Sequence, residues 1–462
     1  MLRALAFSSR HQRRGWALML ALTQTMSCAS TQAAPPQPLS ADDVSWLFPP
    51  PTRADDLTKL ISISALSVPN VQDPAKRDPV WPAAAFQQFI GNAGSAAAQV
   101  AGTSSRIGLP AAAQSIDAWF VSGIRIDAGA PGLSDGLRAQ YGQSPQIRLI
   151  VQPVTRNPDG TPHVLDIAGH LIFAFTTGSN LPAQTGCLPR PVPDLTALRS
   201  IVAELATLRS GLASGQLAGS PVITAGVPLG IHPGLANPVT ADKVRQDMTA
   251  FLERHISGPR LIAMAIVGLP VGAPSPWMFL SMVRVDPGQI PGVPNGGFIP
   301  VHGPALDGQQ FTQMLNPVGV LPRVLPAPHA NNLAPITCVN AANPVPGPVI
   351  SARSGSATAD LFVDSPPSSS ATKTVLDLIA DPTRSHFFNT DCVSCHTETR
   401  RAMELLAVKT IDGIDTAVLP GDSWNVRNFG WSAAPTRATV TRRTAAETAA
   451  VVAFINAQVL GK

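Results

Sequence analysis

The stretches Gln146-Ile-Arg-Leu-Ile-Val-Gln-Pro-Val154 and Val164-Leu-Asp-Ile-Ala-Gly-His-Leu-Ile-Phe-Ala-Phe-Thr-Thr177 flank the tetrapeptide Asn157-Pro158-Asp159-Gly160. Both stretches are rich in aliphatic and β-branched residues, which is typical of strands. The tetrapeptide consists of turn residues, each of which favours a backbone conformation that reverses the chain. The sequence therefore predicts a β-hairpin over residues 146–177.

Outward from the hairpin, strand and helix patterns follow one another in no regular order. Apolar residues recur at spacings of three and four over Asp194–Leu212 and Thr240–Ile256, which predicts two amphipathic helices. Further strands are expected at Ala118–Asp127, Leu261–Leu269 and Trp277–Val285, and further helices at Pro82–Val100, from Asp55 to Leu66, and near 309–315. This mixture indicates an α+β body over residues 35–350.

The body is rich in loops. The chain has 462 residues, with 36 glycines and 46 prolines, and the segment 286–349 is dense in both. Hydrophobic residues make up 45% of the chain and charged residues 13%, which excludes a disordered polyelectrolyte. The triplets Arg148-Leu149-Ile150 and Arg260-Leu261-Ile262 each open a predicted strand pair, so a weak internal duplication is one interpretation of the body.

Residues 1–34 have the pattern of an export signal. Four arginines precede the short apolar run Trp16–Leu22, and small residues follow it. These arginines account for the net charge of +4, so the remainder is neutral and lacks the basic field of a nucleic-acid-binding protein. We expect the mature protein in the periplasm or outer membrane of a Gram-negative bacterium, and no later stretch is apolar for long enough to span a bilayer.

Thr25-Met26-Ser27-Cys28 resembles a bacterial lipobox. Lipidation of Cys28 would then anchor the protein, and the polar, Pro-containing residues that follow would act as a tether. The alternative is cleavage after Ala29 or Ala33 and a product without an anchor. A lipid at Cys28 is the one membrane attachment that we expect.

Cys392-Val-Ser-Cys395-His396 is a C-x-x-C-H signature for one covalently attached c-type haem. Two thiols on one helical turn can bind the two vinyl groups of a haem, and the imidazole that follows can bind the iron as proximal ligand. A redox disulfide and a zinc site are the alternatives. Neither is favoured, because no buried strand precedes the motif and no second C-x-x-C occurs.

Two other cysteines, Cys187 and Cys338, are left once Cys28 and the motif are accounted for. In an oxidising compartment they are expected to form a disulfide. The alternative is two unpaired buried thiols.

Residues 372–462 resemble a class I cytochrome c. A short helix over Thr374–Ala380, aromatic Phe388 just before the motif and a terminal helix over Thr444–Leu460 carry the resemblance, together with the motif. It implies a small all-α haem domain, in which Phe388, Trp424 and Arg427 would contact the haem. Residues 351–371, rich in Ser and Pro, are predicted to be the linker to it.

The sequence leaves the sixth iron ligand open. Class I cytochromes usually use a methionine far downstream, but Met403 follows His396 by two helical turns and is interpreted mainly as a core residue. The alternatives are His386, a histidine of the body such as His302 or His329, or an open site. The open site would be lined by Trp424, Asn425, Arg427 and Asn428, where Arg427 could instead pair with a haem propionate. His170, His232 and His255 are interpreted as structural histidines.

Two functions from different classes follow. The first is transfer of single electrons between redox partner proteins, with the body as a docking or binding domain. The second is a haem-dependent enzyme or sensor, in which peroxide or a gas reacts at an open iron and the body binds a substrate or signal. The sequence favours electron transfer as the chemistry and leaves enzymatic activity undecided.

Overall fold

The computed structural model describes residues 37–95, 98–100, 103–105, 107–130, 138, 142–180, 190–222, 226–268, 277–288, 295–301, 311–316, 323–328, 360–386, 389–390, 392–422, 424 and 427–461. All of them belong to one compact unit, Pro36–Lys462.

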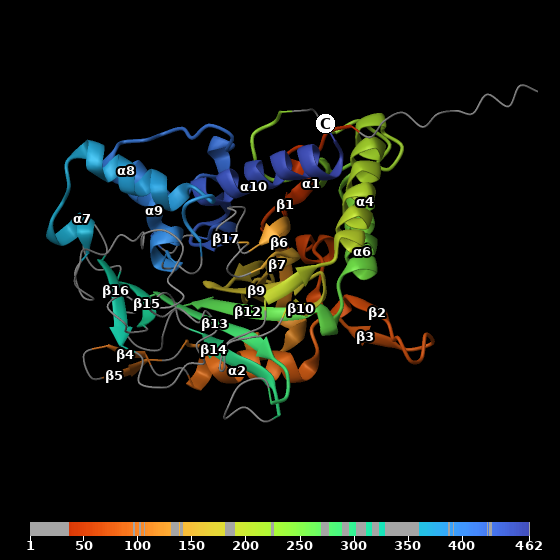
Figure 1. Ribbon diagram of the computed structural model, residues 1–462, viewed down its shortest axis with the longest axis horizontal. Helices are drawn as coiled ribbons and strands as arrows, with labels where there is room; N and C mark the ends of the chain where they lie inside the picture. Colours follow the sequence, from red (N-terminus) through yellow and green to blue (C-terminus); the bar gives the residue numbers. More distant parts are fainter. Residues whose placement is uncertain are drawn as a thin grey trace, which may run out of the picture. The chain divides into compact units, whose positions relative to one another are not determined.

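Within these residues, ten strands form a large antiparallel sheet (Figure 1). Its hydrogen-bonded order is β1 (Ser45–Leu47), β6 (Trp119–Ala130), β7 (Ser144–Arg156), β9 (Ile167–Ala174), β12 (Leu261–Gly268), β13 (Trp277–Val285), β15 (Phe311–Asn316) and β16 (Arg323–Pro328), with β14 (Gly297–Val301) beside β13 and β8 (Pro162–Val164) beside β7. Together with the helices, this sheet confirms the mixed α+β class.

The hairpin predicted over residues 146–177 is confirmed. Strand β7 turns at the tetrapeptide 157–160, and both β8 and β9 then pair with it. Gly160 has a φ of +83°, a conformation that residues with a Cβ rarely adopt, and Asn157 N–H donates to the Thr161 carbonyl (2.8 Å). The turn thus holds the register in which His170 pairs with Ile150.

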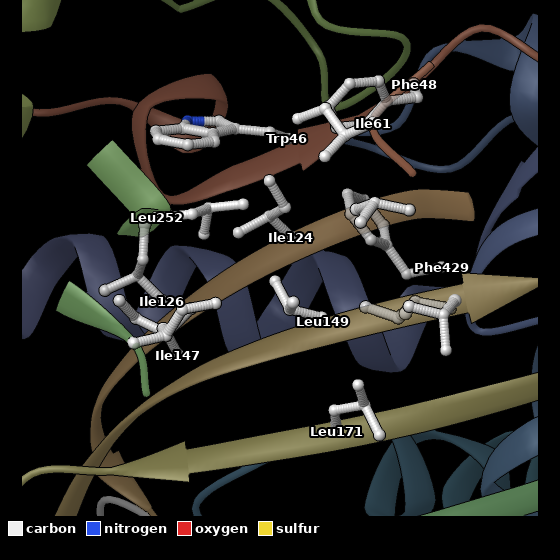
Figure 2. Close-up of a cluster of buried hydrophobic side chains, with 14 of the residues drawn as sticks. Trp46, Phe48, Ile61, Ile124, Ile126, Ile147, Leu149, Leu171, Leu252 and Phe429 are labelled. Atoms are coloured by element: carbon white, nitrogen blue, oxygen red, sulfur yellow. The ribbon is translucent and has the colours of Figure 1, made fainter. Parts of the chain in front are cut away.

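One face of the sheet is apolar. It carries buried aliphatic residues such as Ile124, Leu149 and Leu171, and Trp46 and Leu252 pack above them (Figure 2). Helix α6 (Ala241–His255) supplies Leu252 and helix α2 (Ala83–Ser95) supplies Phe89, whose ring fills the space over Gly169. Burial of this face stabilises the unit through the hydrophobic effect.

The other face, which we call the polar face, carries Arg125, Arg148 and His170. In the strand register, Arg125 of β6 lies opposite Arg148 of β7. Arg148 and His170 lie on the same side of the neighbouring strands β7 and β9. Helices α8 (Ser369–Ala380), α9 (Cys392–Leu405) and α10 (Arg442–Phe454) lie together on one side of the sheet, and α2 (Ala83–Ser95) lies on the other (Figure 1).

The two amphipathic helices are confirmed as α4 (Leu195–Ser214) and α6 (Ala241–His255). The side chain of Asp194 caps the first turn of α4 by accepting from Ala197 N–H (2.9 Å), and Gly215 ends the helix in the left-handed conformation, with φ of +76°. The helix expected near 309–315 is wrong for the described residues 311–315, which lie in β15, where strand pairing decides the conformation. The stretch from Asp55 to Leu66 forms two short 3₁₀ turns, at Asp56–Lys59 and Ile63–Ala65.

The remaining elements of the body are short. They are α1 (Ala41–Val44), β2 (Ser67–Pro69), β3 (Arg77–Pro79), β4 (Ala98–Val100), β5 (Thr103–Ser105), β10 (Thr176–Asn180), β11 (Arg190–Pro193), α5 (Pro233–Ala236) and 3₁₀ turns at Ala111–Gln114, Ile116–Ala118 and Gly258–Arg260.

The residues that follow the body, 360–461, are called the C-terminal segment. They contain α7 (Leu361–Asp364), α8, α9, a 3₁₀ turn at Thr416–Val418, the hairpin β17 (Phe429–Ala433) and β18 (Thr436–Val440), and α10, which continues as a π-helical turn over Ile455–Val459. The expectation of an all-α C-terminal part is therefore wrong. Alternation of buried Phe429 and Trp431 with smaller residues gives the period of two that a strand requires.

The C-terminal segment shares its core with the body. Trp431 is fully buried, its Nε1–H donates to the Phe48 carbonyl (2.8 Å), and its backbone exchanges two hydrogen bonds with the Gln152 side chain (2.6 and 2.8 Å). Gly123 lets Phe429 approach β6, because a Cβ there would lie 2.6 Å from the Phe429 ring. The division into a body, a linker at 351–371 and a haem domain stays a prediction, and α7 and the start of α8 lie inside the predicted linker.

Segments near the start and the end of the described residues are in contact. Leu39 N–H donates to Asn456 Oδ1 (2.8 Å), and Asn456 Nδ2 donates to the Leu39 carbonyl (3.0 Å). Nearby, the Ser45 and Thr448 hydroxyls share a hydrogen bond of 2.8 Å. The start of the described chain is thus attached to α10 and the π-helical turn.

Burial raises the pKa of Asp42 to about 7, and the neighbouring Asp43 carboxylate adds to the effect. Asp42 is protonated in the folded protein between about pH 4 and 7 but ionised in the unfolded chain, so the free energy of unfolding should fall by about 4 kcal/mol as the pH rises through this range. Asp42→Asn should remove this fall and raise the melting temperature at pH 8, but not at pH 4. Thermal denaturation at both pH values tests this, with the exposed Asp242→Asn as control. Equal pH profiles for Asp42→Asn and the wild type would contradict it.

Candidate haem-attachment site

The C-x-x-C-H motif lies in the first turn and a half of α9. Cys392 begins the helix, and Cys395 and His396 follow one turn later. Positions three apart on a helix share a face, so the two cysteine positions are adjacent along α9. Cys395 is partly exposed, whereas His396 is buried, with 8% of its surface exposed. The imidazole therefore faces the protein interior.

The His396 ring lies against the polar face of the sheet. Its centroid is 4.7 Å from that of Phe279 in β13 and 6.5 Å from that of His170 in β9. Register places His170 opposite Ala265, and Phe279 opposite Val267, in the next row on the same face. His396 thus lies over a part of the sheet where small and aliphatic residues separate two rings.

A second hydrophobic cluster surrounds this contact. Phe279 packs there with Val393 and Ala402 of α9, and with Val267, Phe362 and Leu376. Trp424 is partly buried against the same cluster, and the Arg400 guanidinium lies 5.3 Å above its ring. The structure therefore places Trp424, a residue predicted to contact the haem, against the same cluster as Val393 of α9.

Burial, reinforced by charged groups on the polar face, keeps His170 neutral. Burial and the positive charges of His396, Arg427, Arg148 and Arg125, in that order, lower the pKa of His170 to about 3. Arg427, predicted to contact haem, is 1% exposed and donates to Asp166 at 2.7 Å. A neutral imidazole can ligate a metal, whereas a protonated one cannot.

Buried contacts of Glu398 and Arg401, which follow the motif in α9, hold the helix in place. Arg401 pairs with Asp360 through two hydrogen bonds of 3.0 and 2.7 Å, with both side chains fully buried. Burial raises the pKa of Glu398 to about 7, and its carboxyl accepts from Arg443 N–H at 3.2 Å. Helix α9 is thereby joined to α7 and to the start of α10.

The structure places the other candidate ligands differently. Met403 is partly buried against the main hydrophobic cluster of the sheet, not the cluster around Phe279. His386 is buried, and its backbone bonds to Asn389 and Thr390, next to Ser385, which accepts from Arg443. Predictions that concern residues 1–34 with Cys28, Cys187, Cys338, His302, His329, Phe388 and Asn425 lie outside the described residues.

Asn428 has a structural role next to the hairpin. Its carbonyl accepts from Thr441 N–H (3.0 Å) and from the Thr444 hydroxyl (2.9 Å), and its side-chain oxygen accepts from the Thr441 hydroxyl (3.3 Å). These bonds join the start of α10 to β17.

A search of the described residues for three or more His, Cys, Asp or Glu side chains gathered as metal ligands finds no such group. Among the helices of the same residues, none combines the length and the apolar character that a membrane span requires.

Comparisons with known proteins identify no relative. No protein-family model matches the sequence, and no curated protein and no solved structure matches it. The chemistry of the site therefore has to be argued from its own residues.

Sequence reasoning missed two residues of this site, His170 and Phe279. The sequence predicts a structural role for His170, but alternation along β9 places it on the face of Ala168 and Ile172, next to Ile172, which is opposite Arg148 on β7. A histidine and an arginine on one face of neighbouring strands was the available signal. That α9 would cover this face was not visible in any local pattern.

Proposed function

We propose that the protein is an exported c-type cytochrome, which carries one covalent haem on α9 and passes single electrons between redox partner proteins. The observation that carries this proposal is the C-x-x-C-H motif at the start of α9, with the His396 ring buried against Phe279 of the sheet. The donor set fits the group: two cysteines for the vinyl carbons and one imidazole for the iron. A bound haem would supply reversible one-electron exchange at its iron.

The residues of this chain have separate tasks in this proposal. Cys392 and Cys395 would hold the haem through thioether bonds, and His396 would bind its iron. Phe279 and Trp424, which belong to the hydrophobic cluster beside His396, would keep water away from a bound haem and so would influence its reduction potential. Arg427 lies near His170 and is suited to bind an anionic propionate.

The wider assignment belongs to the same proposal. Haem of this type is attached outside the cytoplasm, which agrees with the export pattern of residues 1–34 and with lipidation at Cys28 on the periplasmic or outer-membrane side. The body would serve as the docking or binding domain, and the all-antiparallel sheet is its framework.

Covalent attachment is tested by expressing the full chain in a periplasm that contains the c-type maturation system. A denaturing gel stained for haem should show the wild type, and intact mass should increase by one haem. The Cys392→Ser/Cys395→Ser variant should lose the stain completely, whereas Ser394→Ala, inside the same motif, should keep it. A wild-type band without stain or added mass would contradict the proposal.

A further inference from the structure

We propose that His170, on β9 of the sheet, is the second axial ligand of the haem iron. The inference rests on the proposed function, since it requires a haem on α9. His170 and His396 are 226 positions apart in the chain, and the fold brings their ring centroids to 6.5 Å.

The separation of the rings fits two ligands of one metal. Metal–imidazole bonds are about 2.0–2.1 Å long, so two imidazoles on opposite sides of one ion have centroids roughly 6.4 Å apart. The planes of the two rings are inclined by 85°. Each imidazole can rotate about its own bond to the metal, so this inclination is compatible with ligation.

The place of His170 on the sheet supports the same role. It lies on a central strand, opposite Ala265 on one side and Ile150 on the other, so its backbone is held by two neighbours. Ala168, fully buried, is the next residue of the strand on this face. Two of its four neighbours on this face, Ala168 and Ala265, are small, which leaves room beside the imidazole on the face that α9 covers.

A ligand on a rigid strand also has a physical advantage over a ligand on a loop. Strand pairing fixes its orientation before the metal binds, so little conformational freedom is lost on ligation. His386, by comparison, lies in the turn between α8 and α9, whose backbone is bonded to Asn389 and Thr390. Met403 packs in the main hydrophobic cluster. The geometry therefore favours His170 over both earlier candidates.

The test uses the full chain with attached haem and compares wild type, His170→Ala, His170→Met and His386→Ala. His163→Ala, an exposed position on β8, is the matched control. Optical spectra of the oxidised and reduced forms, with and without carbon monoxide, report how many strong ligands the iron has. Near-infrared magnetic circular dichroism of the oxidised form distinguishes two histidines from a histidine and a methionine.

The expected wild type is low-spin with two histidine ligands and does not bind carbon monoxide on mixing. His170→Ala should become high-spin and bind the gas, whereas His386→Ala and His163→Ala should keep the wild-type spectrum. His170→Met, which keeps a ligand, should show the histidine–methionine signature and a higher reduction potential. This second variant decides the matter if His170→Ala does not fold.

Three outcomes would overturn the inference and leave the proposed function intact. These are a high-spin wild type, a low-spin His170→Ala protein, and a two-histidine signature in folded His170→Met. A wild type without covalent haem would instead overturn the proposed function, and the haem-stained gel shows this before any spectrum is taken.

Discussion

Asp360→Ala is expected to lower the free energy of unfolding by about 3–5 kcal/mol, as removal of one partner from a buried ion pair does. Asp360 and Arg401 are fully buried and share two hydrogen bonds, so the variant leaves the guanidinium without its carboxylate. Asp360 also caps α7 by accepting from Phe362 N–H (2.9 Å), and that bond is lost as well. Urea denaturation followed by circular dichroism measures the loss.

The matched comparison separates burial of charge from loss of packing. Replacing both partners, as Asp360→Leu with Arg401→Met, should restore a large part of the stability, because no buried charge then remains. Lys243→Ala breaks an exposed ion pair with Asp247 and should change the midpoint much less. If Asp360→Ala lost no more stability than Lys243→Ala, the Asp360–Arg401 ion pair would not be what holds α9 in place.

Trp431→Ala should lower the free energy of unfolding of the whole unit by about 3–5 kcal/mol. The indole is fully buried and bonded to the Phe48 carbonyl, and its removal leaves a cavity between β17 and the body together with an unpaired carbonyl. Because the C-terminal segment shares this core, unfolding should remain a single transition at a lower urea concentration. Tryptophan fluorescence and circular dichroism should report the same midpoint.

The result also bears on domain organisation. An independently folded haem domain over residues 372–462 would unfold in its own transition, and Trp431→Ala would shift that transition alone. Val71→Ala, at a residue with 94% of its surface exposed, is the control and should leave the midpoint unchanged. Two separate transitions in the variant would contradict the shared core.

Elements with a local cause could be predicted from the sequence. Helix α4 was recognisable because its apolar spacing and its Asp194 cap lie within the same twenty residues. The hairpin at Asn157–Gly160 was recognisable because turn residues separate two strand patterns. In both cases the chain needs no distant partner to select the conformation.

Features with a distant cause could not be predicted. Phe311–Asn316 forms β15 because it pairs with β13 and β16, although its composition is compatible with a helix. The motif Cys392–His396 was visible at once, since its chemistry lies in five consecutive residues. Its partner His170 was not, because only the docking of α9 on the sheet brings the two histidines together.

Two hydrogen bonds join Leu39, near the start of the described residues, to Asn456 of the π-helical turn. Segments of a fold that share no contact exchange their amide hydrogens through separate local openings. Here, an opening that releases Leu39 also removes a partner of the π-helical turn, so these two segments are expected to open together. Proteolytic cleavage next to Leu39 would therefore also destabilise the π-helical turn at the end of α10, although the two segments are far apart in the sequence.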